Sequence, residues 1–409
     1  MDLPQYTATD LATAMRNNPS SCLNGWDMLL AYPLAALNTA VSDISVNALP
    51  HHIMIDTTTN DPLHGPTPIS LKVYITPSSM AFTDTGDGGS ITLRFNLAGG
   101  LPLDINANGY FLTCTAPLSA VTASLTGTDP ISQVCVFQHD VATWRLALAL
   151  PNPMVTVADL QGNTLPLSDP RLGSEVPIVI KYIQTVGLQM SLIDLRWNAP
   201  PSALRPTQVA FSMVPGQGDQ KAVVLMWLEL DGVSDRTVAL DPGVRNQFMA
   251  GPNSVPTYPI PTDADPSAGG TVFISRKAAY DLLIQPQLRS YDYTLHLEPT
   301  QGLSGMTVSM FTATDHGHGN TTYSNTGTVT LDGDSLTDFK ILDPDGGSLP
   351  HHLTPTSASL NPSDLVVPTS LLASTKTLFT VNAVNGLYIP HDFMFVGVVP
   401  APTQASTGA

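Results

Sequence analysis

The chain has 409 residues, of which 43% are hydrophobic and only 12% are charged, and its formal net charge is −17. The acidic residues are scattered and there is no basic stripe, so the sequence argues against binding nucleic acid through its phosphates. The 36 prolines and 30 glycines favour short strands joined by turns over a helical bundle. A chain of this length exceeds the size at which one core stops growing, so we expect two packed units.

The cysteines and the N-terminal segment indicate the redox state and the cellular location to expect for the protein. Cys22, Cys114 and Cys135 have neither the number nor the spacing of a disulfide framework or a metal site, so we interpret them as reduced core or strand residues. The first twenty residues lack a basic start and a continuous apolar core, so we expect no secretory signal. The default expectation is a cytoplasmic location, with release by another route left open. No apolar run of about 18 residues predicts a membrane-spanning helix.

The strongest local signal lies at residues 24–46, where apolar residues recur at helical spacing. Asn24 is the expected N-cap, Asp27 falls in the first turn, and Pro33 is expected to kink the helix. The helix would be apolar on nearly all sides, so we expect it to be enclosed by other elements. The residues expected to line a ligand channel along it are Trp26, Leu30, Leu34, Leu37, Val41 and Ile44. The same spacing would suit a filled core, because periodicity does not distinguish a filled tube from a hollow one.

After this helix the pattern changes to a period of two. Residues 69–75 and 91–97 alternate apolar and polar side chains, and the turn-forming stretch 83–90 joins them into a predicted hairpin. Further strands are predicted at 143–150, 177–183, 208–214 and 222–230. The first half therefore reads as one helix followed by a series of strands.

The second half begins after a stretch rich in proline and glycine. Residues 271–288 allow a shorter helix through Ala278 and Leu282 that ends at or before Pro286, and strands follow it. Helix followed by strands thus occurs twice, which suggests two related units. The expected organisation is an N-terminal extension at 1–22, a first unit at 23–250, a linker or loop at 251–270, a second unit at 271–400 and a disordered tail at 401–409.

Several short segments resemble those of a known family. Gly25-Trp26-Asp27 precedes the apolar segment with Asn38, and Thr271-Val272-Phe273-Ile274-Ser275 precedes Tyr280-Asp281-Leu282-Leu283-Ile284 and Pro286-Gln287-Leu288. In their order and spacing these segments resemble the clostridial P-47 protein family over most of residues 24–290. The resemblance implies an α+β, mostly β, TULIP-like fold, in which highly twisted antiparallel sheets wrap around a long apolar helix in two related units.

The same resemblance implies a function and partners. TULIP proteins carry lipid in an apolar channel between helix and sheet, and P-47 proteins are encoded beside toxin genes. A lipid or acyl-chain ligand is therefore implied, together with other proteins of the same gene cluster. Contact with phosphoinositides, also implied by the family, is put in doubt because this chain is poor in Lys, so few cations are present for phosphates.

The sequence contains no strong catalytic, phosphate-binding or metal-binding motif. The sequence contains no nucleophile elbow, no phosphate-binding loop and no zinc-protease motif, and its two glycine-rich acidic loops lack the order of a calcium site. Three histidine pairs are interpreted as turn or strand-edge residues and not as metal ligands: His51 and His52, His316 and His318, and His351 and His352. Four cations, which could form an anion patch or simply lie on solvated faces, are Lys72, Arg94, Arg145 and Lys181. We therefore expect no metal, no cofactor and no enzymatic activity.

Three functions remain after these exclusions. The first is non-catalytic binding of lipid or another hydrophobic ligand in an apolar channel between helix and sheet. The second is a structural or accessory interaction protein of a toxin-type complex, with a filled core. The third is an all-β glycan-binding or hydrolytic protein, which is disfavoured because Trp26, Trp144 and Trp227 lie at core-like positions instead of on an exposed platform.

Overall fold

The structure is a computed structural model of the whole chain. It describes residues 3–18, 21–41, 51–61, 65–86, 88–99, 110–118, 135–140, 143–150, 153–172, 175–196, 204–233, 247–249, 255–266, 268–284, 294–299, 305–315, 321–332, 338–342, 357–359, 379–381, 387–388, 390 and 392–400. These residues form three antiparallel sheets and a few helices, so the expectation of an α+β, mostly β protein is confirmed.

The central sheet has ten strands from both halves of the chain. Its order is β10-β7-β6-β11-β12-β1-β13-β21-β19, and β20 also pairs with β21. The strands are β1 (Met28–Pro33), β6 (Cys135–Asp140), β7 (Thr143–Leu150), β10 (Leu188–Arg196), β11 (Pro206–Val214), β12 (Val223–Leu230), β13 (Gly269–Ile274), β19 (Thr380–Val381), β20 (Leu387–Tyr388) and β21 (Phe393–Val398). Strands from residues 269–274 and 393–398 thus complete the sheet that β1 begins.

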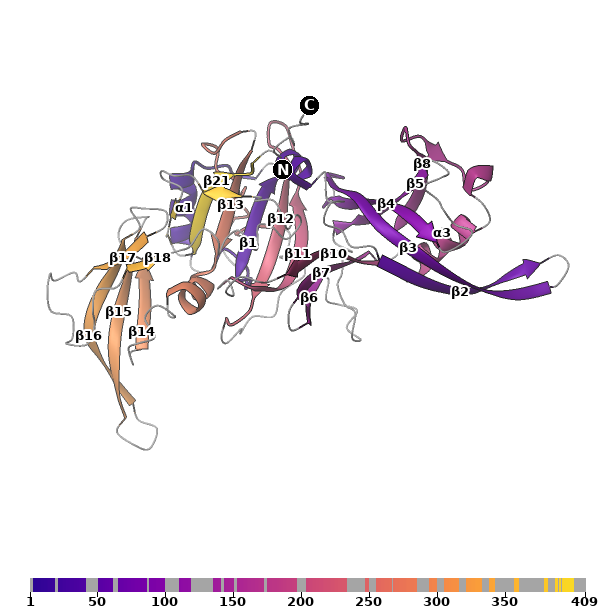
Figure 1. Ribbon diagram of the computed structural model, residues 1–409. Helices are drawn as coiled ribbons and strands as arrows, with labels where there is room; N and C mark the ends of the chain where they lie inside the picture. Colours follow the sequence, from indigo (N-terminus) through magenta and orange to yellow (C-terminus); the bar gives the residue numbers. More distant parts are fainter. Residues whose placement is uncertain are drawn as a thin grey trace, which may run out of the picture.

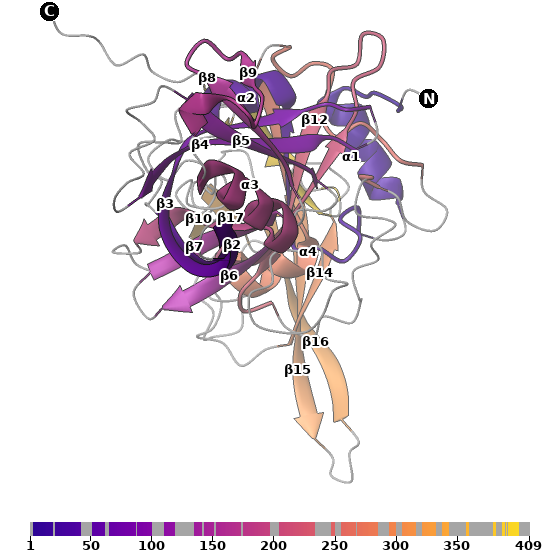
Figure 2. The ribbon, with the colours of Figure 1, turned by 90° about the vertical axis from the view of Figure 1, so that its right-hand side faces the viewer.

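A second sheet of six strands curves around a helix. Its order is β2-β3-β4-β5-β8-β9, and we call it the curved sheet. Figure 2 shows β2 and β3 bending around helix α3 (Glu175–Val186), which follows the short helix η4 (Pro170–Leu172). The strands are β2 (His51–Asp61), β3 (Gly65–Thr83), β4 (Ser90–Gly99), β5 (Tyr110–Pro117), β8 (Met154–Asp159) and β9 (Thr164–Leu165). The predicted hairpin of residues 69–97 is confirmed, because β3 pairs with β4 up to the turn between Thr83 and Ser90.

A third sheet of five strands lies on the other side of the central sheet (Figure 1). The chain reaches it through α4 (Arg276–Ala278) and η5 (Ala279–Ile284), the helix expected before Pro286. Ser275 is the N-cap of α4, because its Oγ accepts a hydrogen bond from the Ala278 N–H at 3.1 Å. The strands, in sheet order, are β14 (Thr294–Pro299), β15 (Gly305–Asp315), β16 (Thr321–Asp332), β17 (Asp338–Leu342) and β18 (Ser357–Ser359).

Both faces of the central sheet are covered around β1. Side chains alternate along β1, so Leu29 and Ala31 face one side and Leu30 and Tyr32 face the other. We call the first side the outer cluster, which contains α1 (Ala8–Asn17) and residues of the 248–264 segment. We call the second side the inner cluster, whose buried apolar side chains come from β1, α2 (Leu34–Val41), β3, β4, β5, β8, α3, β11, β12, β13 and β21.

The expected single helix over residues 24–46 is wrong. Residues 28–33 form the strand β1, and the helix α2 covers only Leu34–Val41. The reason is that β1 lies between β12 and β13 and is buried on both faces, with all six of its residues buried. A strand buried on both faces is a continuous apolar run, which periodicity cannot separate from a buried helix. The predicted N-cap Asn24 instead has a left-handed backbone, with φ of 53°, in the turn before β1.

The strand expected at 177–183 is also wrong, because these residues belong to α3. Their β-branched composition favours a strand, but the buried positions Val176, Val179, Ile180 and Ile183 have helical spacing. Pro177 lies in the first turn, where a missing N–H is tolerated. Burial of one helical face in the curved sheet therefore outweighs the local propensity.

The predicted division into units stays a prediction. Residues 255–266 of the expected linker form a loop that packs on the outer face, where Thr257, Tyr258 and Ile260 are buried. Within the expected extension at 1–22, Leu11 and Met15 of α1 are buried in the same outer cluster.

Candidate ligand-binding interior

The helix α3 and the curved sheet enclose the first part of the inner cluster. Val176, Val179, Ile180 and Ile183 point from α3 into this cluster with at most 1% of their surface exposed. Opposite them, cross-strand rows of apolar side chains cover the inward face of the sheet: Leu93, Cys114 and Val155 in one row, and Phe95, Leu112 and Val157 in the next. An aliphatic helix face thus lies against an aliphatic sheet face.

Thr92, Thr115 and Arg94 of the curved sheet face away from this interior. Thr92 and Thr115 are neighbours on the outward face, where their hydroxyl oxygens are 3.1 Å apart. Arg94 stacks its guanidinium over the Phe111 ring, 3.1 Å from the ring centroid. Among the described residues, no buried charged, amide, Ser or Thr side chain lies on α2, α3, β3, β5 or β8, but Tyr110 of β5 brings a buried phenol hydroxyl into the inner cluster. Apart from that hydroxyl and the Cys114 thiol, the described side chains between α3 and the sheet are hydrocarbon.

The curved sheet is fastened to the central sheet next to α2. The Asn38 side chain pairs with the backbone of Phe82, donating from Nδ2 to the Phe82 carbonyl at 2.7 Å and accepting from its N–H at 2.8 Å. Asp84 Oδ2 accepts a hydrogen bond from the Gly216 N–H at 2.8 Å. The rings of Phe82 and Phe211 are 6.0 Å apart. These contacts make the inner cluster continuous from α3 to the central sheet, and they give Asn38 a structural role.

Tyr32 carries a polar atom into this continuous interior. Its side chain is fully buried in the inner cluster, two residues before α2 begins. Within the part of the chain that the structure describes, the Tyr32 hydroxyl has no hydrogen-bond partner. Burial raises the pKa of Tyr32 well above 10, because the phenolate would lose its hydration. The group is therefore a neutral phenol that can both donate and accept.

Of the six residues expected to line a ligand channel, the structure describes five and divides them between the two clusters. Leu30, Leu37 and Val41 lie in the inner cluster, and Leu34 packs against it. Trp26 lies on the opposite face, in the outer cluster with α1. Ile44 falls outside the described residues. The assignment of these residues to a ligand channel stays a prediction.

Sequence analysis missed the residues that α3 contributes to the interior. Helical spacing of apolar residues at 176, 179, 180 and 183 was the available signal, but the β-branched composition concealed it. Tyr32 was also missed, since it lay outside the expected channel stripe of a helix at 24–46. Reading 28–33 as an alternating buried strand would have placed Tyr32 on the same face as Leu30.

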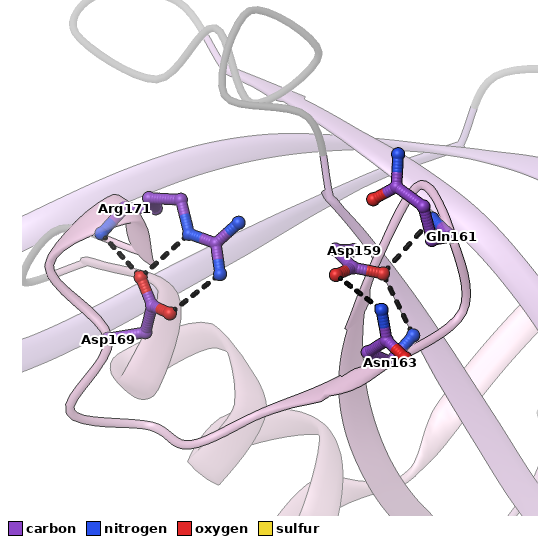
Figure 3. Close-up of polar contacts among 5 residues, drawn as sticks. All are labelled: Asp159, Gln161, Asn163, Asp169 and Arg171. Atoms are coloured by element: carbon purple, nitrogen blue, oxygen red, sulfur yellow. Dashed lines mark hydrogen bonds and ion pairs between the residues drawn. The ribbon is translucent and has the colours of Figure 1, made fainter.

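Two acidic side chains stabilise turns at the rim of the curved sheet, beside α3 (Figure 3). Asp159 accepts hydrogen bonds from the N–H groups of Gln161 and Asn163 and from the Asn163 side chain, which lower its pKa. Asp169 forms a bidentate pair with the Arg171 guanidinium at 2.8 and 2.9 Å. This pair and the Arg171 N–H lower the pKa of Asp169 to about 2. Both carboxylates are thus bound by their own turns.

A titration tests the Asp169–Arg171 pair. We expect the Asp169 carboxyl to titrate near pH 2, against an ordinary value of 3.8, and Arg171→Ala to return it towards that ordinary value. Because the folded-state pKa is lowered, the stabilisation is present above about pH 4 and is lost as the pH falls towards 2. NMR observation of the side-chain carboxyl carbon measures this directly. An unchanged midpoint in Arg171→Ala would show that the guanidinium is not the cause.

Polar clamps hold the start of β1 to β12 and α4, and the N-terminal loop to the start of β21. The Asp27 backbone donates to the Leu228 carbonyl and accepts from the Ser275 N–H, while its Oδ2 accepts from the Leu230 N–H at 2.8 Å. The Gly25-Trp26-Asp27 segment therefore joins β1 to β12 and to the N-cap of α4. Asp392, which is 1% exposed, accepts hydrogen bonds from Cys22 and Arg276 N–H groups and from the Ser21 hydroxyl.

The described cysteines and cations do not form a reactive or anion-binding site. Cys22 and Cys114 are buried free thiols whose pKa values are raised, chiefly by burial. Lys72 lies over the Tyr74 ring near one end of the β3–β4 ladder, while Arg94 pairs with Ser79 towards the other. Lys181 lies on the exposed face of α3. Among the residues described, these cations do not converge; the Arg145 side chain lies outside that part.

A small open pocket lies on another part of the surface. It encloses about 510 Å³, its open mouth included, between the segment near Gln5 and the loop of Tyr258 and Thr262. The Tyr258 hydroxyl donates to the Lys221 carbonyl at 2.9 Å, and burial raises the pKa of Tyr258 to about 12. The Lys221 ammonium in turn donates to the Pro266 carbonyl. This lining is more polar than the inner cluster and does not suit an acyl chain.

The described part of the chain shows neither a metal site nor a spanning helix. No group of three or more potential metal ligands occurs among the described residues. His316 and His318, and likewise His351 and His352, lie outside those residues, and His51 and His52 form the start of β2. Over the same described ranges, no helix is long and apolar enough to cross a membrane.

Comparison with known proteins returns a few distant similarities. No protein-family model matches the chain, and no curated protein sequence matches it. P47 of Clostridium botulinum E1 is similar at 10% identity and a TM-score of 0.37, over 92% of this chain and 100% of that one. P47 from Clostridium botulinum A2 is similar at 10% identity and a TM-score of 0.35, over 94% and 100%. A lipopolysaccharide binding protein gives 8% identity and a TM-score of 0.18, over 92% and 99%.

These TM-scores are below 0.5, so the similarities carry no inference about ligands, partners or activity. The P47 proteins that the sequence resembles are nonetheless the proteins that the comparison of structures also finds, over most of both chains.

Proposed function

We propose that this protein is a non-catalytic, TULIP-like binder of lipid or of another hydrophobic ligand, which it holds between α3, α2 and the two sheets. The observation that carries the proposal is the aliphatic face of α3 enclosed by the curved sheet (Figure 2). Val176, Val179, Ile180 and Ile183 supply the contacts of that face. Contacts of this kind are non-directional, and an acyl chain inserted between helix and sheet would offer the same ones.

Binding of a chain in this interior would be driven by burial of hydrocarbon. Each methylene group transferred from water contributes about 0.8 kcal/mol. The energy available therefore grows with chain length, but it is offset by any separation of α3 from the sheet. This predicts a preference for long acyl or alkyl chains over short ones, with little dependence on ionic strength because few charges face the interior.

The second candidate is a structural or accessory interaction protein with a filled interior. The observation that favours it is the complete burial of Val179 and Ile183, each of which has 0% of its surface exposed. A dry, filled core of this kind needs no ligand. Other proteins of the same gene cluster would then be the partners.

Native mass spectrometry of the purified full-length protein separates the two candidates. We expect an adduct of lipid mass that survives gentle ionisation and is lost on denaturation, or uptake of added oleyl alcohol by the apoprotein. Val179→Phe should reduce this uptake, because the larger side chain overfills the interior. Gln184→Phe is the matched control, since it introduces the same side chain on the exposed face of α3. A clean apoprotein mass without uptake would exclude the lipid proposal and favour the filled-core candidate.

A further inference from the structure

The buried hydroxyl of Tyr32 lies in a defined place within the inner cluster. Along the central sheet its neighbours on the same face are Val224 of β12 and, beyond it, Met213 of β11. On its other side β13 has Gly270, above which Phe379 and Val399 pack. All these neighbours are apolar, so the described surroundings of the phenol ring are those of a hydrocarbon core.

An unpartnered hydroxyl is unfavourable in such a core. A buried polar group without a hydrogen bond costs about 1 to 3 kcal/mol relative to one that is satisfied. Phenylalanine would fill nearly the same volume without this cost. The described chain supplies no partner for the Tyr32 hydroxyl, so a partner from outside the chain would remove this cost.

The interior restricts the chemistry of that partner. An ionised carboxylate or phosphate would be buried there without a counter-charge, which is strongly unfavourable. A neutral phenol instead suits an uncharged oxygen. It can donate a hydrogen bond to that oxygen, or accept one from it if the oxygen is a hydroxyl. We propose that the Tyr32 hydroxyl binds the polar end of an uncharged acyl-chain lipid, through an alcohol or ester oxygen. This inference rests on the proposed function, and it adds the class of the head group and the residue that selects it.

Competition binding to Tyr32→Phe tests the proposal. The reporter is the neutral fluorophore N-phenyl-1-naphthylamine, and the competitors are oleyl alcohol and 1-octadecene, which have equal chain lengths and differ in the hydroxyl. We expect both to displace the reporter from the full-length chain. In Tyr32→Phe, oleyl alcohol should bind about 3- to 10-fold more weakly, corresponding to one net hydrogen bond, while binding of 1-octadecene stays unchanged.

Tyr258→Phe is the matched control, because its hydroxyl has a partner in the chain and lies in the outer cluster. It should leave both affinities unchanged and lower the Tm, whereas Tyr32→Phe should raise the Tm of the ligand-free protein or leave it unchanged.

If neither competitor binds the unaltered chain, the proposed function fails. If both bind and Tyr32→Phe changes neither affinity, only the role of Tyr32 is overturned. A lower Tm for ligand-free Tyr32→Phe would mean that a buried water satisfies the hydroxyl, which also overturns it.

Discussion

Asp392→Ala is expected to lower the free energy of unfolding by about 3 to 4 kcal/mol. The Asp392 carboxylate accepts hydrogen bonds from the Cys22 N–H at 2.7 Å, the Ser21 hydroxyl at 2.9 Å and the Arg276 N–H at 3.0 Å. Alanine removes the acceptor from all three donors, and the Cys22 N–H then remains buried without this partner. The three bonds join the N-terminal loop, α4 and the start of β21, so the loss should loosen this end of the central sheet.

Urea denaturation followed by tryptophan fluorescence measures this effect. The matched control is Asp231→Ala, which removes the same group from an exposed position 3.6 Å from Arg205. An exposed ion pair of this kind is worth at most about 1 kcal/mol, so the control should stay close to the unaltered protein. Equal losses in the two variants would show that Asp392 does not act as a clamp.

Ile180→Ala is expected to destabilise the protein by about 2 to 4 kcal/mol. The side chain is 1% exposed and faces the curved sheet from α3, so its truncation leaves a cavity in the inner cluster. A cavity lined by aliphatic side chains stays dry and accepts apolar molecules. Saturation with 1-octadecene should therefore recover part of the lost stability, because a ligand that binds only the folded state shifts the unfolding equilibrium.

Thermal denaturation with and without 1-octadecene checks this second expectation. Lys181→Ala is the control, since Lys181 is the next residue of α3 and is exposed to solvent. It should change the stability by less than about 0.5 kcal/mol and leave the response to 1-octadecene unaltered. A loss below about 1 kcal/mol for Ile180→Ala would contradict the tight packing of α3 on the sheet. A normal loss without recovery by 1-octadecene would mean that ligands do not reach this part of the interior.

The two expectations concern different parts of the fold. Asp392 tests what holds both ends of the chain in the central sheet, and Ile180 tests what fills the space around α3. The Tyr32 side chain lies in the inner cluster two residues before α2, and Asn38 of α2 fastens the curved sheet through Phe82. The substitutions at Ile180 and Tyr32 therefore test the acyl chain and the head group of a ligand separately.

Features that depend on local patterns could be predicted from the amino-acid sequence. Alternation of apolar and polar residues, with a glycine-rich turn, predicted the β3–β4 hairpin, because one face of that hairpin is buried and the other is solvated. The helical segment after Ser275 followed from its spacing and from Pro286. The mostly β composition followed from the turn-forming residues. For the hairpin and the helical segment, the signal is the contrast in residue type between a buried and an exposed face.

Features without a clear contrast between a buried and an exposed face depend on long-range packing and could not be predicted from local patterns. Residues 28–33 are apolar throughout because β1 is covered on both sides, so the pattern did not separate strand from helix. Trp26 and Leu30, expected on one stripe, therefore lie in different clusters. Residues 177–183 have the composition of a strand but form part of α3, since the curved sheet buries a helical stripe. The isolation of the Tyr32 hydroxyl depends on neighbours distant in sequence, such as Val224 and Phe379, and no local pattern records it.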